Sequence, residues 1–226
     1  MSFNSFSYKC IVLATSVFII LLATTFSSNT FANKVDILVL SNKHQSVPNV
    51  GVSLTLLGKN HDKDKEPVPQ VMNQIDTQFS PHILMAQKGA NISFPNSDNV
   101  KHHVYSFSEA KTFELKLYKD QKPEPLPFEQ AGTVTLGCNI HDWMLGYVYV
   151  VDTPYFSKTN ESGFLQLELP DGDYEVRLYN PLLQKSDLQR VDKVSISGNK
   201  NITIQLKHAM LNATDSFEEG DEFDAY

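Results

Sequence analysis

Cysteine is scarce in this chain. Among its 226 residues there are two, and the first, Cys10, lies in an apolar segment near the N-terminus. There Lys9 precedes the uncharged run IVLATSVFIILLATTF, and small residues stand at Thr30 and Ala32, which is the layout of a cleavable export signal. The alternative is an uncleaved membrane anchor, for which the run is short and broken by threonine and serine. Cleavage after Ala32 leaves Cys138 without a partner for an intramolecular disulfide.

The chain also lacks the features of several functional classes. No basic patch stands out, so nucleic acid is not an expected partner. The Cys-x-x-Cys-His motif of covalently bound haem is absent. No apolar run after the signal is long enough to cross a bilayer, so we expect no membrane association after cleavage. The formal net charge is −7, and residues 209–226 carry six acids and no base, which predicts a solvated, disordered tail.

Segments with a helical period are missing as well, and alternating apolar and polar residues take their place. The alternation is clear in VDILVL (Val35–Leu40), VGVSLTLL (Val50–Leu57) and KTFELKLY (Lys111–Tyr118). Similar short runs, separated by turn residues, continue almost to the C-terminal tail. The pattern predicts an all-β protein built as one or two β-sandwiches.

The remaining cysteine stands in the segment GCNIHDWM (Gly137–Met144), between two predicted strands. Two residues separate Cys138 from His141, and two more separate His141 from Met144. A tight loop therefore brings a thiolate, an imidazole and a thioether to one side. Soft sulfur ligands with imidazole suit copper, and two histidines, a thiolate and a weak axial thioether form a blue-copper electron-transfer site. The loop supplies three of these four ligands.

A second histidine is available upstream, in the segment FPNSDNVKHHVYSF. His102 and His103 stand there at the start of a predicted strand. Adjacent side chains of an extended segment point to opposite faces, so only one of the pair can reach the same metal. Alternation alone does not decide which one.

These stretches resemble the cupredoxin family of blue-copper proteins. The resemblance is carried by FPNSD with HHV, and by G-x-V-x-L-G-C-x-x-H-x-x-M-x-G-x-V-x-V. The Cys-x2-His-x2-Met spacing is similar to that of amicyanin, the family member with a short ligand loop. The mature chain also resembles a smaller group of cupredoxin-like proteins labelled methylamine utilization proteins, through HHVYSFS, GCNIHDWM and VDTPYF.

The resemblance implies a ligand set. In cupredoxins the upstream histidine usually stands six residues after an asparagine, and counting from Asn96 gives His102. His103 stands where the family has an asparagine that braces the ligand loop, and it stays an alternative upstream ligand. The implied copper ligands are His102, Cys138, His141 and Met144.

Two other interpretations use the same residues. Zinc could be held by His102, His103, Cys138 and His141, although the adjacent histidines make a tetrahedron awkward. A cupredoxin fold without metal would leave Cys138 as a small buried hydrophobe and Met144 as core filler. Trp143, inside the loop, is expected to pack beside the metal or to form part of a docking surface.

A second module is indicated by TNESGFLQLELPDGDYEVRL, which resembles the sandwiches called carboxypeptidase-regulatory-like or transthyretin-like. Such sandwiches start with a strand pair, so the first two predicted strands are expected to fold with the C-terminal ones, and the cupredoxin is then an insertion. The alternative gives the first strands to the cupredoxin itself. The expected division is a signal at 1–32, a strand pair at 33–68, a copper domain at 69–153, a second sandwich at 154–208 and a tail at 209–226.

The function expected from these features is single-electron transfer in the periplasm, with copper as cofactor and no substrate chemistry, so the protein is not expected to be an enzyme. The resemblance implies a redox partner protein, such as a c-type cytochrome or a dehydrogenase, and a role in amine oxidation. Two alternatives remain. One is a copper accessory or chaperone factor, and the other is an envelope module that binds carbohydrate or protein and carries a vestigial site.

Overall fold

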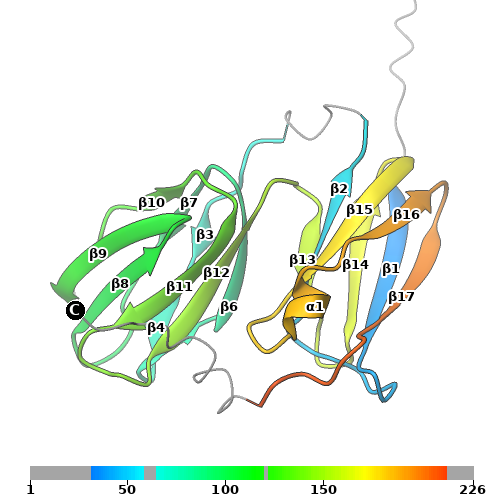
Figure 1. Cartoon of the computed structure of the whole chain (residues 1–226). Helices are drawn as coiled ribbons and strands as arrows, with labels where there is room; N and C mark the ends of the chain where they lie inside the picture. Colours follow the sequence, from blue (N-terminus) through cyan, green and yellow to red (C-terminus); the bar gives the residue numbers. More distant parts are fainter. Residues whose placement is uncertain (1–31, 59–64, 120–121, 213–226) are drawn as a thin grey trace, which may run out of the picture. The chain divides into compact units, whose positions relative to one another are not determined.

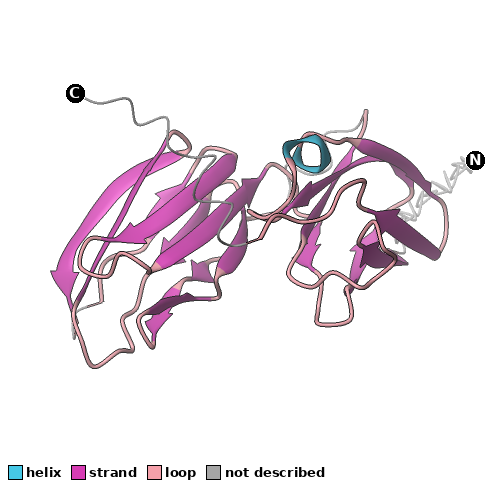
Figure 2. Ribbon diagram, turned by 60° about the horizontal axis from the view of Figure 1, so that its bottom comes forward, coloured by secondary structure: helices cyan, strands magenta, loops and turns pink. Residues whose placement is uncertain are grey.

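The computed structural model describes residues 32–58, 65–119 and 122–212. The predicted export signal, apart from Ala32, and the tail from residue 213 onward lie outside the described residues. Within them, regular structure consists of strands β1 to β17 and one helix of four residues, α1 (Lys185–Leu188) (Figure 2). The prediction of an all-β protein is therefore confirmed. None of the described helical structure is long and apolar enough to span a membrane.

Two sheets, made of strands from both ends of the described chain, form the first sandwich (Figure 1). One sheet has the order β14 (Phe164–Leu169), β1 (Asn33–Leu40), β17 (Lys200–Gln205). The other has the order β13 (Phe156–Lys158), β2 (Gly51–Leu56), β15 (Gly172–Tyr179), β16 (Asp192–Ile196). The N-terminal strands therefore pair with C-terminal ones. In particular, β2 lies antiparallel to β15, with Leu56 opposite Tyr174.

Alternation along the strands explains this core. On β1 the side chains of Val35, Ile37 and Val39 have no exposed surface, while their neighbours in sequence are partly exposed. Leu54 on β2 and Tyr174 on β15 are also fully buried and belong to the same cluster. Complete burial of an aliphatic or aromatic side chain stabilises a fold by about 1.5–3 kcal/mol, so the period-2 pattern holds the two sheets together.

All strands of the second sandwich come from the stretch between β2 and β13. Its larger sheet has the order β6 (Ile83–Gln87), β12 (Leu145–Val151), β11 (Gly132–Cys138), β8 (His102–Ser108), β9 (Lys111–Tyr118). Its smaller sheet has the order β10 (Leu126–Phe128), β7 (Ala90–Ser93), β3 (Gln70–Val71), and a hairpin joins β4 (Asn73–Ile75) to β5 (Gln78–Ser80). This sandwich has its own core, which includes Phe94, Phe128, Leu136 and Val148.

Gly146, at the start of β12, is a point of close packing in this core. A Cβ atom there would lie 2.7 Å from Cβ of Phe79, whose side chain is 2% exposed. We expect Gly146→Ala to lower the free energy of unfolding by about 1–3 kcal/mol, the usual cost of overpacking. Urea unfolding measures the loss. Thr135→Ala, at an exposed position of β11, is the control and should change stability by less than about 0.5 kcal/mol. Equal stability of the two variants would contradict the packing argument.

Candidate metal centre

The predicted ligand residues lie where two neighbouring strands meet. β8 begins at His102 and β11 ends at Cys138, and the two strands are antiparallel, with Cys138 opposite Val104. The backbone N–H of Asn139 donates to the carbonyl of His103 at 3.0 Å, which ties the start of the ligand loop to β8. This backbone bond links the loop to β8 through main-chain atoms, so it does not depend on which side chain stands at position 103.

The ligand loop, residues 139–144, consists of two successive tight turns. The N–H of His141 donates to the carbonyl of Cys138 at 3.4 Å, and the N–H of Met144 donates to the carbonyl of His141 at 2.9 Å. These bonds fold the chain back over the end of β11 before β12 starts at Leu145. The short spacing of the loop is thus what returns His141 to Cys138.

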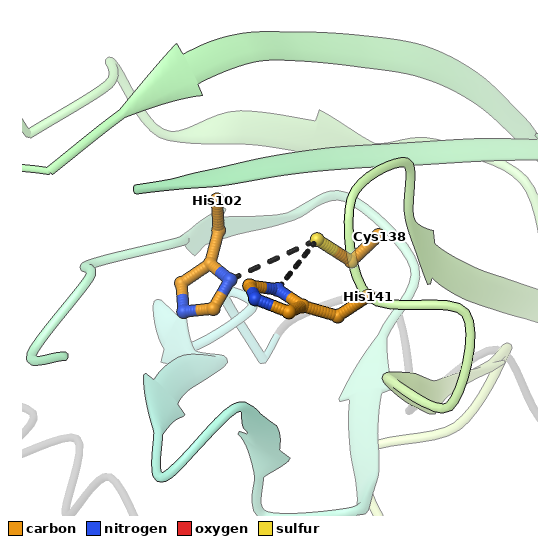
Figure 3. A group of neighbouring side chains, drawn as sticks. All are labelled: His102, Cys138 and His141. Atoms are coloured by element: carbon orange, nitrogen blue, oxygen red, sulfur yellow. Dashed lines mark hydrogen bonds between the residues drawn. The ribbon is translucent and has the colours of Figure 1, made fainter. Parts of the chain in front are cut away.

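Three donor atoms converge as a result (Figure 3). The sulfur of Cys138 lies 3.7 Å from Nδ1 of His102 and 3.6 Å from Nδ1 of His141. All three donor atoms lie within 4.8 Å of one another. His102 is completely buried, Cys138 is 4% exposed and His141 is half-buried. The centre is therefore closed toward the core and reaches the surface through His141.

These separations can be compared with those that one shared ion requires. With a thiolate sulfur about 2.3 Å and an imidazole nitrogen about 2.0 Å from a metal such as zinc, the two donors are about 3.5 Å apart in a tetrahedron and about 3.7 Å apart in a trigonal plane. The observed values of 3.7 and 3.6 Å agree with this range. A thiolate with two imidazoles is a donor set that copper favours, so the residues fit a copper ion.

Asp98 fixes the orientation of the buried histidine. Its Oδ2 lies 2.6 Å from Nε2 of His102. Because a carboxylate only accepts hydrogen bonds, Nε2 of His102 carries a proton, and in the neutral ring Nδ1, which faces Cys138, then presents a lone pair. Metal-binding histidines commonly donate their second N–H to a carboxylate in this way, which orients the ring and raises its basicity as a ligand. Asp98 is not among the residues that the sequence predicts for the site.

The Asp98 carboxylate is itself held by the turn between β4 and β5. The N–H of Asp76 donates to Oδ1 at 2.5 Å, and the N–H of Thr77 donates to Oδ2 at 2.9 Å. Burial alone would raise the pKa of Asp98. Hydrogen bonds from Thr77, His102 and Asp76, together with attraction to His102, outweigh burial and hold the pKa below its usual value. Asp98 is therefore an ionised partner of His102.

Two further predicted ligands, Met144 and His103, are not among the three converging donors. Met144 is 1% exposed and packs in the same core as Cys138, at the end of the ligand loop. His103 points to the other face of β8, where its Nε2 lies 2.7 Å from Oε1 of Glu114. It therefore takes no part in the cluster of donors, and a zinc site that needs both adjacent histidines is not assembled here.

The rim beside His141 is apolar. The ring of Trp143 lies 5.4 Å from that of His141, and the side chain is 68% exposed. Ile140, from the same loop, is 48% exposed. Nε1 of Trp143 lies 3.4 Å from Oγ1 of Thr77, the residue whose N–H also holds Asp98. Trp143 thus packs against the centre and presents apolar surface next to it.

Comparison with known proteins adds only a likeness of fold. No family model and no curated protein matches this chain. Among solved structures, a reduced Cu(I) form of an amicyanin mutant is 19% identical, and the match covers 44% of this chain and 98% of that chain with a TM-score of 0.33. A Cu-containing nitrite reductase from Thermus scotoductus SA-01 is 19% identical over 44% of this chain and 25% of that chain, with a TM-score of 0.35. At these values the likeness carries no weight for function.

Proposed function

We propose that this chain is an exported, cupredoxin-like copper protein that carries single electrons and performs no substrate chemistry itself. The observation that supports the proposal most is the position of the Cys138 sulfur between two imidazole nitrogens at 3.6 and 3.7 Å. Export rests on the N-terminal segment and explains why an unpaired thiol would matter, since free thiols tend to be oxidised outside the cytosol.

Each residue of the centre has a distinct task. Copper bound there would supply one-electron chemistry between Cu(I) and Cu(II). Cys138 would bind as the thiolate, and its burial protects the sulfur from oxidants in solution. The bond from His102 to Asp98 fixes one imidazole before any metal arrives, so little rearrangement is needed on binding or on electron transfer. Met144, which is buried at the end of the ligand loop, would supply the thioether ligand that the resemblance to cupredoxins implies.

The exposed side of the centre is suited to contact with a partner. His141 is the one half-buried member of the donor cluster, and its loop neighbours Ile140 and Trp143 expose apolar surface. We propose that a redox protein, such as a c-type cytochrome or a dehydrogenase, docks on this rim and exchanges electrons through His141. A role in amine oxidation follows from the resemblance to methylamine utilization proteins and is the most specific part of the proposal.

The test is to load the purified mature protein with one equivalent of Cu(II) and to record optical and spin-resonance spectra together with the reduction potential. We expect an intense blue or green colour, one copper per chain and a reversible one-electron wave. A colourless copper adduct would count against electron transfer. Reversible colour with rapid loss of copper to an acceptor protein would instead identify a copper chaperone.

The two upstream histidines give a sharper test of the ligand set. We expect His102→Ala to abolish or strongly change the visible spectrum, because it removes a donor 3.7 Å from the Cys138 sulfur. His103→Ala should keep the spectrum, because His103 pairs with Glu114 on the other face of β8. The two variants differ by one position in the same strand, so each is a control for the other. The reverse result would show that His103 is the ligand.

A further inference from the structure

A cavity of about 680 Å³ lies outside the metal centre, in one compact unit of the chain. Its walls come from the loop after β1, the junction of β5 and β6, the first residues of β12, β13 and the segment that follows β15. The volume is in the range of small-molecule sites, about 300–1,000 Å³. None of the residues described above as donors lines it, but Trp143 is one of its lining residues.

The cavity has positive charge without a matching acid. Lys158 and His82 are among its lining residues, and none of the lining residues is aspartate or glutamate. Nζ of Lys158 donates to the carbonyl of Ile83, which leaves two of the three ammonium donors for other partners. No carboxylate pairs with Lys158 in the described part of the chain, although surface pairs such as Lys88 with Asp152 occur elsewhere. A partly buried ammonium that lacks a counter-ion favours an anion beside it.

The pKa shifts of Lys158 and His82 agree with a partly buried positive charge that has no acidic partner among the described residues. Burial lowers the pKa of Lys158. Burial also lowers the pKa of His82; a backbone hydrogen bond with Leu145 opposes this, and the nearby charge of Lys158 adds to it. The two groups thus lie close enough to repel each other when both are protonated. An anion would relieve that repulsion and replace the water that Lys158 loses on burial.

The other walls are mainly apolar. Leu145, Leu182 and Met210 face the cavity together with several prolines, and the ring of His82 meets that of Tyr147 edge-on at 5.4 Å. Asn49, Asn180 and Gln78 are the neutral polar side chains among the lining residues. A ligand suited to these walls has an apolar or aromatic body and one anionic end. A wholly polar anion, such as inorganic phosphate, would leave most of the wall without a partner.

We propose that this cavity binds a small organic carboxylate, with its anionic end at Lys158 and its apolar body along Leu145, Leu182 and Met210. The site is independent of the metal, because no donor residue of the centre lines it. A ligand there would lie against Trp143, whose ring also packs beside His141. Binding in the cavity would therefore change the surroundings of Trp143 at the rim of the metal centre.

The experiment uses metal-free mature protein and phenylacetate as the probe. Trp143 is the only tryptophan of the chain and lines the cavity, so its fluorescence reports binding there. Phenylacetamide, a neutral molecule of nearly the same shape, is the matched ligand control. We expect saturable binding of phenylacetate and at least tenfold weaker binding of phenylacetamide. Equal affinities, or no saturation by phenylacetate up to about 10 mM, would overturn the proposal.

Two variants test the role of the lysine. Lys158→Met keeps the apolar stem and removes the charge, and it should weaken phenylacetate binding at least tenfold while leaving phenylacetamide unchanged. Lys88→Met removes a charge at an exposed position and should leave both affinities unchanged. If Lys158→Met binds phenylacetate as tightly as the parent protein, the proposal is wrong. The comparison of the two ligands in the unmodified protein decides the matter even if that variant does not fold.

Discussion

Replacing Cys138 by alanine removes the intense visible absorption expected of the copper-loaded protein. The colour of such a site comes from the bond between the thiolate and copper, and Cys138 supplies the sulfur that lies between the two imidazole nitrogens. The variant keeps both histidines and so can still bind Cu(II) weakly, as a pale adduct. Titration with Cu(II), followed by optical and spin-resonance spectra, measures the loss. We expect complete disappearance of the band and a large fall in affinity.

The fold should survive this substitution, which makes the result easy to interpret. Cys138 is a small residue, 4% exposed, at the end of β11, and its strand pairing with β8 uses only backbone atoms. Alanine removes one sulfur atom from the core, so the loss of unfolding free energy should stay near the low end of core truncations, about 1 kcal/mol. Ser106→Ala, a buried change on β8 outside the cluster, is the control and should keep the colour. An intact band in Cys138→Ala would mean that the colour has another origin.

Local sequence patterns were sufficient to predict the buried faces of strands and the contact between Cys138 and His141. Val35, Ile37 and Val39 are buried at every second position because one face of β1 packs in a core, and the sequence marks that face with β-branched residues although the opposite face carries Leu38 as well as Asp36. The approach of His141 to Cys138 is equally local, since two tight turns in a loop of six residues leave few other positions for the ring. Short-range spacing was therefore sufficient to predict that two of the three members of the donor cluster, Cys138 and His141, lie together.

The sequence alone does not decide whether His102 or His103 faces the other donors. Alternation shows that one of them faces inward, but the register of β8 against its neighbours decides which. His102 pairs with Tyr118 on β9 and Val104 pairs with Leu115, with a shift in register between them. Such a bulge changes which residues face inward, and no pattern within the single segment reveals it.

The role of Asp98 could not be obtained from local patterns at all. Its carboxylate is held by the N–H groups of Asp76 and Thr77, 22 and 21 residues earlier in the chain. That contact exists only after the hairpin of β4 and β5 has packed beside the loop before β8. A weak signal was nevertheless present, because Asp98 and His102 stand four residues apart and carboxylates often support metal-binding histidines.

Helix α1 was not predicted for a simpler reason, because a segment of four residues is too short to show a helical period.

The Asp98 carboxylate is the subject of the second prediction with a large expected effect, which concerns copper affinity and reduction potential. We expect Asp98→Asn to weaken copper binding by about 10–100-fold, the usual cost of removing the partner of a metal-binding histidine. We also expect the reduction potential to rise, because a negative charge next to His102 stabilises Cu(II) more than Cu(I). Competition with a chelator measures the affinity, and voltammetry of the loaded protein measures the potential.

Asparagine cannot reproduce the hydrogen bonds that aspartate makes at this position. Oδ1 accepts from Asp76, and Oδ2 accepts from both Thr77 and His102. If the amide oxygen of the substituted asparagine takes the place of Oδ2, its NH₂ group meets the N–H of Asp76, so two donors face each other. The ring of His102 then loses either its partner or its fixed orientation. Asp142→Asn removes an equal charge from an exposed position of the ligand loop and serves as the control. If both variants shift the affinity and the potential equally, Asp98 acts only as a distant charge, and its contact with His102 has no special part in positioning the ligand.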